Sequence, residues 1–188
     1  MNSMRTIAAR CAGALAIAAL GLCIAPTMGV AQATPAASAP AAATQAADLF
    51  DFWVGEWALS WRNADGTPGT GRNRITKILD GTVIQEEFET LSGEAPPMLK
   101  GRSLSVLSQG VWRQAWADNQ GGFFAFTGQV DGDKRIFITA PRASKDGKTV
   151  LQRMVFHAIT PKSLTWDWES SDDGGQRWTL QWRALYSR

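Results

Sequence analysis

The sequence has few of the residues on which metal and thiol chemistry depend. Its 188 residues include two Cys, one His and one Tyr. The single His excludes a metal site built from several histidines, and both cysteines, Cys11 and Cys23, lie near the N-terminus. The net charge is only +2, so the chain lacks the basic balance of a nucleic-acid-binding protein, and no nucleic-acid partner is expected. The length also excludes a sialidase-type propeller or a TIM-type barrel.

The first 33 residues have the pattern of a secretory signal peptide. Arg5 and Arg10 precede the uncharged apolar run Cys11–Ala25, which has the length of a signal core and is short for a membrane span. Ala31-Gln32-Ala33 supplies the small-x-small pattern after which a signal peptidase cleaves. We therefore expect residues 1–33 to be removed, leaving a periplasmic or secreted protein with no stable membrane span. A retained anchor helix and a lipid-modified Cys23 are the alternatives.

Removal of that segment changes the composition of the chain. Both cysteines and two arginines leave and no acidic residue does, so the mature chain would be neutral and free of thiols and disulfides. Residues 34–47 contain only Ala, Pro, Thr, Ser and Gln, which offer too little apolar surface to offset the entropy of ordering. We expect this segment to be a disordered spacer. All nine Trp and all eight Phe lie in residues 48–188, the expected folded domain.

The folded part is predicted to consist of ten short strands separated by turns. Turn pairs such as Asp80-Gly81 and Asp131-Gly132 tolerate the positive φ that tight hairpins need. Strands joined by short links are antiparallel neighbours, and closing them removes the two exposed edges. The sequence therefore predicts an all-β, roughly ten-stranded, antiparallel up-and-down barrel of calycin or lipocalin type, with a two-sheet sandwich as the alternative. The predicted strands are Val54–Trp61, Arg72–Leu79, Thr82–Leu91, Leu99–Leu107, Val111–Asp118, Gly122–Val130, Lys134–Ala140, Lys148–Ile159, Ser163–Ser170 and Gln176–Tyr186. One short helical turn is expected within Ala47–Trp53.

Alternation along the strands places aromatic and polar side chains on the same face. One face of the fifth predicted strand carries Trp112, Gln114, Trp116 and Asp118, and one face of the last carries Trp178, Leu180, Trp182 and Ala184. Aromatic walls with a few polar groups are typical of ligand pockets, although Trp also fills a barrel efficiently by packing alone. The candidate ligand-binding residues are Trp57, Asn73, Glu86, Phe88, Gln114, Trp116, Asp118, Trp166 and Trp168.

Several short motifs occur in an order that resembles one family of bacterial barrels. They are the segments 50–57, 71–75, 78–81, 100–104 and 112–118, Glu86 with Phe88, and 171–175 with Trp178 and Tyr186. Together they resemble the domain of unknown function 1579 family or a close sister, which is similar to nitrobindin and fatty-acid-binding proteins within the calycin-like set. The resemblance implies a β-barrel and no established reaction. Residues 105–108 depart from the pattern, since relatives often carry Asn, an aromatic residue and Asp there.

Two further patterns suggest chemistry and have simpler explanations. His157 is the only histidine, and a single imidazole can hold a haem iron, but nitrobindin-like barrels place that ligand nearer the C-terminus. We expect an ordinary strand histidine and no cofactor. Ser171, Asp173, Gly175 and Trp178 match the Asp-box turn of sialidase-like propellers. Propellers carry several copies and this chain carries one, so we expect a structural hairpin.

Three function classes remain open. The first is an exported barrel that binds a small apolar or aromatic ligand, and an interior completely filled by Trp and Phe would exclude it. The second is a hydrolase or isomerase that uses Glu86 or Asp118, because an inward carboxyl group is paired, hydrogen-bonded or shifted in pKa. The third is an envelope protein-interaction module, which an exposed apolar patch on the outer wall would favour. No nucleophile–base pair is present, no catalytic residue is assigned, and the sequence does not specify the ligand or the oligomeric state.

Overall fold

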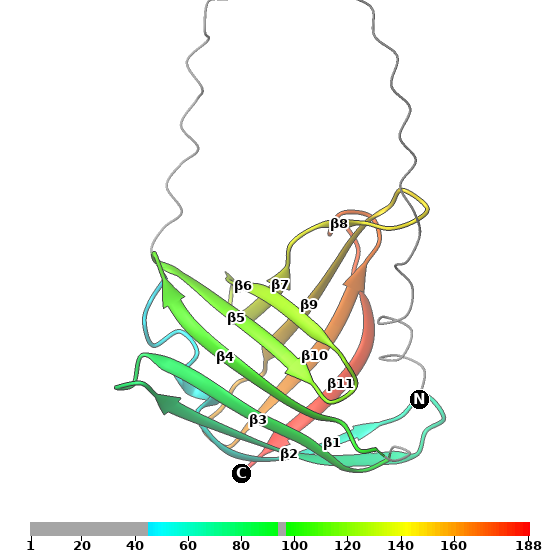
Figure 1. Cartoon of the computed structure of the whole chain (residues 1–188). Coiled ribbons are helices and arrows are strands. Elements are labelled where there is room, and N and C mark those ends of the chain that lie inside the picture. The colour runs from blue at the N-terminus through cyan, green and yellow to red at the C-terminus, as the bar shows by residue number, and fades with distance from the viewer. Residues whose placement is uncertain (1–44, 94–96) are drawn as a thin grey trace, which may run out of the picture.

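The computed structural model describes residues 45–93 and 97–188, which form a closed antiparallel β-barrel (Figure 1). The predicted signal peptide and most of the predicted spacer lie outside the described residues. Ten strands form the wall in chain order, and the last wall strand pairs with the first as well as with the strand before it, so the barrel closes as expected. The wall strands are β1 (Gly55–Arg62), β2 (Pro68–Ile78), β3 (Val83–Ser92), β4 (Lys100–Ser108), β5 (Val111–Asp118), β6 (Phe123–Asp131), β7 (Lys134–Thr139), β9 (Thr149–His157), β10 (Ser163–Ser171) and β11 (Thr179–Ser187).

An eleventh strand, β8 (Arg142–Ala143), was not among the predicted strands. It pairs only with the first residues of β9, beside the wall rather than in it. Two residues are too short a segment for alternation to be recognised, so no sequence signal marked it.

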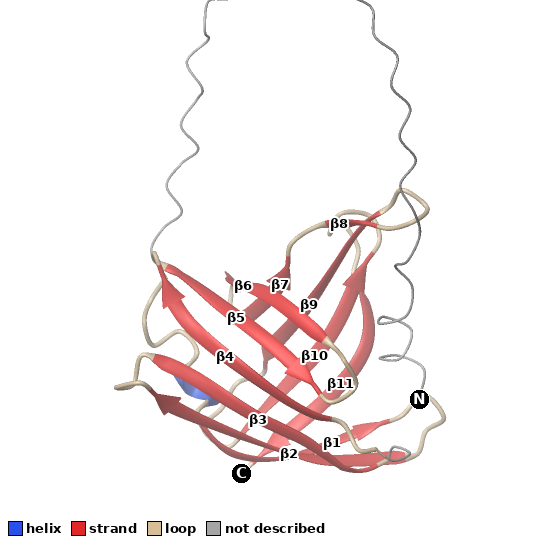
Figure 2. Ribbon diagram, in the orientation of Figure 1, coloured by secondary structure: helices blue, strands red, loops and turns tan. Residues whose placement is uncertain are grey.

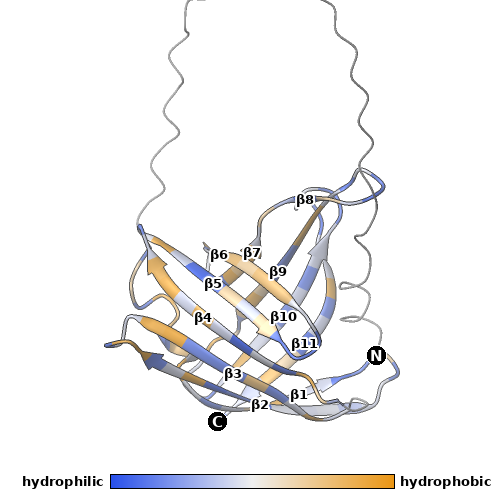
Figure 3. Ribbon diagram, viewed as in Figure 1, coloured by the Kyte–Doolittle hydropathy of each residue, from blue (hydrophilic) through white to orange (hydrophobic). Residues whose placement is uncertain are grey.

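The predicted alternation is present along the wall strands. Buried and exposed residues alternate along β1, β2 and β4, and Figure 3 shows hydrophobic and hydrophilic residues following one another along the strands. On β3 the side chains of Ile84, Glu86 and Phe88 are buried together, as expected. The inward set from all strands forms one aromatic-rich core.

The last strand departs from strict alternation because of a β-bulge. Trp168 pairs with Trp182, whereas Glu169 pairs with Leu180, so Gln181 is the extra residue. A bulge of one residue moves every residue beyond it to the opposite face. The expectation that Trp178 and Leu180 share a face with Trp182 and Ala184 is therefore wrong. Leu180 is exposed, whereas Ala184 is buried in the core.

One end of the barrel is closed by the segment that precedes β1. The expected helical turn is present as the 3-10 helix η1 (Asp51–Trp53), which Figure 2 shows at the same end as the β2–β3 and β4–β5 turns. The Phe50 ring stacks on Phe137 with centroids 4.2 Å apart. Phe156 meets the Trp53 ring edge-on at 5.1 Å. This end of the barrel, the closed end, therefore gives no access to the interior.

The described chain already packs against the barrel at Gln45. The Gln45 side chain donates to the Gly128 carbonyl oxygen at 2.8 Å and accepts from the Trp112 backbone N–H at 2.8 Å. The Trp112 indole N–H donates to the Ala46 carbonyl oxygen at 3.0 Å. These bonds satisfy backbone and indole groups at the closed end and hold the first described residues against the barrel.

Candidate functional site

The opposite end of the barrel holds a pocket, here called the mouth pocket, with a volume of about 650 Å³. The mouth pocket lies where β6 and β7 are no longer paired with each other. β6 pairs with β5 from Phe123 onward but with β7 only from Phe126 onward, and the chain leaves the wall after Thr139 toward β8. A pocket of this volume lies within the range of roughly 300–1,000 Å³ that small-molecule sites occupy.

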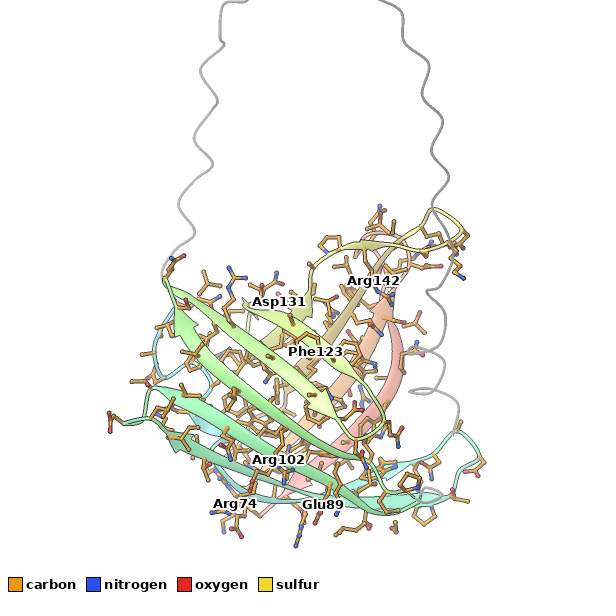
Figure 4. All side chains as sticks on the ribbon, viewed as in Figure 1. Arg74, Glu89, Arg102, Phe123, Asp131 and Arg142 are labelled. Atoms are coloured by element: carbon orange, nitrogen blue, oxygen red, sulfur yellow. The ribbon has the colours of Figure 1, made fainter. Side chains whose placement is uncertain are left out.

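The mouth pocket has an aromatic floor and a polar rim. Leu99, Phe124 and Trp168 form the floor, and Asp118, Arg142 and Gln152 contribute polar groups. Figure 4 labels Phe123 on β6 and Arg142 on β8, and both residues line the mouth pocket. An apolar floor with a few polar groups is the usual arrangement of a ligand site.

A second, smaller space, here called the inner cavity, lies below that floor. Its volume is about 40 Å³, and Leu99, Phe124 and Trp168 line both spaces. On the same measure a single water needs about 10–15 Å³, whereas a cavity that binds benzene measures about 150 Å³. The inner cavity therefore accommodates a few water-sized groups and no aromatic ring. Its other lining residues are Leu59, Glu86, Phe88, Trp116, Phe126, Met154, Trp166, Trp182, Ala184 and Tyr186.

Glu86 brings the one carboxyl group to the inner cavity. It lies on β3, 5% exposed, and accepts from Asn73 Nδ2 at Oε1 and from Ser103 Oγ at Oε2, both at 2.7 Å. Asn73 Nδ2 also donates to the Tyr186 hydroxyl oxygen at 3.1 Å. Burial raises the pKa of Glu86 to about 7, although the bonds from Ser103 and Asn73 and the charge of Arg102 oppose that rise. Burial also raises the pKa of Tyr186 well above its ordinary value, and the Glu86 charge adds to the effect.

The nine predicted site residues divide into three groups. Five line the inner cavity, and one of these, Trp168, also lines the mouth pocket together with Asp118. The other three are buried and line neither of these two spaces. The five are Glu86, Phe88, Trp116, Trp166 and Trp168, and the three are Trp57, Asn73 and Gln114.

These three buried residues have hydrogen-bond partners within the barrel. Trp57 donates from its indole N–H to the Trp53 carbonyl oxygen at 2.7 Å. Gln114 donates to the Ser105 hydroxyl at 2.9 Å. Asn73 joins Glu86 to Tyr186, as described above. None of the three lines either space.

Asp118 holds the turn between β5 and β6. Its Oδ1 accepts from the backbone N–H groups of Gln120 at 2.9 Å and Gly122 at 2.8 Å. Its Oδ2 accepts from the Trp116 indole N–H at 3.0 Å. A carboxylate that accepts from three donors holds its surroundings in position. Glu86, in contrast, is the carboxyl group that lines the inner cavity.

Several lining residues were not predicted. Tyr186, Trp182 and Ala184 alternate along β11, and Phe124 and Phe126 alternate along β6, so the period-two pattern that selected the other candidates was present. No local signal identifies Arg142 or Gln152, because they reach the mouth pocket only through the course of β8 and β9.

His157 lies on the outer wall and not in either space. Its Nε2 lies 3.0 Å from Asp167 Oδ2, and Arg183 donates two bonds to Asp167, of 2.7 and 2.6 Å. Burial pushes the pKa of Asp167 upward, but the bonds and charges of Arg183 and His157 outweigh it, so the pKa is lower than usual. These three residues form an outer-wall ion cluster.

The Asp-box residues close the β10–β11 hairpin. Ser171 Oγ donates to Asp173 at 2.8 Å and accepts from the Gly175 N–H at 2.9 Å, while Asp173 accepts from the N–H groups of Gln176 and Arg177 at 3.0 Å. These bonds hold the turn of the hairpin together, which is the structural role expected from the sequence. Trp178 lies beyond this turn, with the Arg153 guanidinium 3.9 Å above its ring.

Within residues 45–93 and 97–188, no group of three or more His, Cys, Asp or Glu side chains is placed to hold a metal ion. The same residues contain no helix that is long and apolar enough to cross a membrane.

No family model matches the chain, and no curated protein matches it. Among solved structures, a de novo designed fluorescence-activating β-barrel is 18% identical, covering 75% of this chain and 97% of its own, with a TM-score of 0.39. A redesigned β-barrel is 11% identical, covering 73% of this chain and 92% of its own, with a TM-score of 0.35. The assignment of this chain as a barrel rests on its strand pairing and not on these likenesses.

Proposed function

We propose that this domain binds a small, mainly apolar or aromatic ligand in the mouth pocket. The observation that supports the proposal is a pocket of about 650 Å³ whose floor is made by Leu99, Phe124 and Trp168. These side chains also bound the inner cavity, so a ligand on the floor lies next to it. The interior below is mostly filled, since the inner cavity has a volume of about 40 Å³, and this limits the ligand body to the mouth pocket.

Two parts of the proposal depend on the sequence alone. We propose export to the periplasm or beyond, supported by the signal pattern of residues 1–33. We also propose kinship with the domain of unknown function 1579 family, supported by the order of the short motifs. Catalysis by Glu86 is less well supported, because the other titratable group that lines the inner cavity is the Tyr186 phenol, and burial raises its pKa well above the ordinary value.

A neutral fluorescent dye tests the ligand site. Nile red should bind the mature protein saturably, at one equivalent, with the blue-shifted emission of an apolar site. Ala140 is exposed and lines the mouth pocket, so Ala140→Trp should obstruct it and weaken binding. Ala64→Trp adds the same side chain at an exposed position outside the pocket and serves as the matched control. Equal binding by both variants would contradict the proposed site.

A second candidate function is supported by a patch on the outer wall. Leu104, Ala115 and Ala125 are paired across β4, β5 and β6, and Ala117 pairs with Phe123 beside them. All five are exposed, Phe123 by 70%. A contiguous apolar surface of this kind is typical of protein contacts.

Another part of the outer wall is dominated by charged side chains. Across β1 to β4 it carries alternating charges, including ion pairs of Arg74 with Glu87 at 3.5 Å and of Arg102 with Glu87 at 3.4 Å. Figure 4 labels Arg74, Glu89 and Arg102 in this region. A photo-crosslinker at Ala115 should capture a discrete envelope partner in cells, whereas one at the exposed Ser60 should not. Identical crosslinking patterns at the two positions would exclude the interaction function.

A further inference from the structure

The inner cavity combines one acid with aromatic walls. Glu86 is the only carboxyl or basic side chain among the residues that line it. Eight aromatic side chains line it, among them four Trp, and Trp166 and Trp182 meet edge-on at 5.2 Å. Aromatic faces attract cations, most strongly where water is excluded.

No cation of the described chain pairs with Glu86. Its two bonded donors, Asn73 on β2 and Ser103 on β4, are neutral, and the third polar neighbour, Tyr186 on β11, is a phenol. The nearby guanidinium of Arg102 belongs to the outer wall, where its side chain is 57% exposed and pairs with Glu87 at 3.4 Å. A buried carboxylate is stabilised by a cation or by hydrogen bonds, and Glu86 has two neutral donors and no paired cation among the described residues.

Although no cation pairs with Glu86, its hydrogen bonds favour the anionic form of the carboxyl group. One donor points at each oxygen, and an ionised carboxyl group accepts bonds at both oxygens while donating none. Burial opposes ionisation and raises the pKa to about 7. A small cation in the inner cavity would satisfy the carboxylate and remove this conflict.

The size of the inner cavity indicates which cation fits. A volume of about 40 Å³ excludes a ring but admits water-sized groups, and an ammonium group is about the size of a water molecule. A planar guanidinium is larger. The wider mouth pocket lies directly above, across the shared side chains of Leu99, Phe124 and Trp168.

We propose that the ligand is an apolar or aromatic primary amine whose ammonium group enters the inner cavity and pairs with the Glu86 carboxylate. The apolar body remains in the mouth pocket on Leu99, Phe124 and Trp168. This inference rests on the proposed function, because it specifies the chemical class of ligand for the same site.

Matched amine and alcohol probes test the inference by calorimetry at pH 8, where Glu86 is mostly ionised. The amines are 2-phenylethylamine, 3-phenylpropylamine and 4-phenylbutylamine, and each has an alcohol of the same length as its control. At least one amine should bind about tenfold more tightly than its alcohol, a difference of about 1.4 kcal/mol. Glu86→Gln should abolish the preference, and Glu89→Gln, on the charged outer wall, should retain it.

A second measurement keeps the inference falsifiable if Glu86→Gln does not fold. The Glu86 carboxyl carbon of the wild-type protein can be followed by NMR as pH changes. A bound amine should lower the pKa of Glu86 below its free value, and the matched alcohol should not. An unchanged pKa with saturating amine would overturn the proposal.

The outcomes separate the two proposals. Equal affinity for amine and alcohol, or binding of Nile red without any amine binding, would overturn the amine inference and leave the ligand site standing. If Nile red, the amines and the alcohols all fail to bind, the ligand-binding function itself is wrong.

Discussion

The indole ring of Trp116 on β5 lies directly over Gly101 on β4, so closely that a methyl group at position 101 would overlap it. Ser103 and Trp116 are paired across these two strands, so the ring slants toward the mouth and covers the glycine near the start of β4. The ring then forms part of the inner cavity wall. Because Gly101 has no side chain, the Trp116 ring can occupy this position.

Gly101→Ala should destabilise the domain by about 1–3 kcal/mol, because the added methyl group forces Trp116 to move within a packed core. Urea unfolding followed by Trp fluorescence measures the change. Ser60→Ala, a comparably small change on the exposed face of β1, should stay within about 0.5 kcal/mol. Comparable effects from the two variants would show that Trp116 has free space around it.

Glu86 should make the barrel less stable as pH rises from 4.5 to 7. Its pKa is raised from 4.5 to about 7 on folding, so between these values the folded state binds the proton more tightly than the unfolded state. The stabilisation by protonation is complete below pH 4.5 and is lost as pH rises through about 7. The loss is on the order of 3 kcal/mol.

The comparison with Glu86→Gln isolates this contribution, because all other groups titrate equally in both proteins. Urea unfolding of both from pH 4.5 to 8 should show the wild type losing stability relative to the variant. A constant difference across this range would contradict the raised pKa.

Asp118→Ala should weaken the turn between β5 and β6. The change leaves the N–H groups of Gln120 and Gly122 and the Trp116 indole without their acceptor. A loss of about 1–3 kcal/mol is expected from unfolding curves. Asp118→Asn should recover part of this loss, since the amide oxygen can accept both backbone bonds but the amide nitrogen cannot accept from the indole. If Asp118→Ala were as stable as the wild type, Asp118 would not stabilise the turn.

Asp167→Ala should destabilise the wall between β9, β10 and β11. Arg183 and His157 would both lose the nearly buried acceptor that joins them. Arg183 is half exposed, so water partly replaces the lost bonds and we expect about 1–2 kcal/mol. The depressed pKa of Asp167 means that its contribution is present above the unfolded value of 3.8 and is lost as pH falls below it. The free energy of unfolding of the wild type, measured as pH is lowered, should therefore include a loss of stability below pH 3.8 that Asp167→Ala does not show.

Much of the barrel followed from local patterns. Period-two alternation and turn pairs identified all ten wall strands, because each short link forces its two strands to be antiparallel neighbours. The same alternation brought Glu86, Phe88 and Trp116 to one side of the wall. It failed on β11, where the bulge at Gln181 has no sequence signature and reverses the faces of Trp178 and Leu180.

The sequence by itself determined the strands, their order and the inward aromatic set, since these depend on residue type and on spacing along the chain. Only the tertiary structure decided which inward groups face open space. The parting of β7 from β6 makes the mouth pocket, and the Asn73 and Ser103 bonds position the Glu86 carboxyl group at the inner cavity. Those features depend on packing between strands distant in sequence, where volume and desolvation decide whether a polar side chain supports a turn, as Asp118 does, or faces a cavity, as Glu86 does.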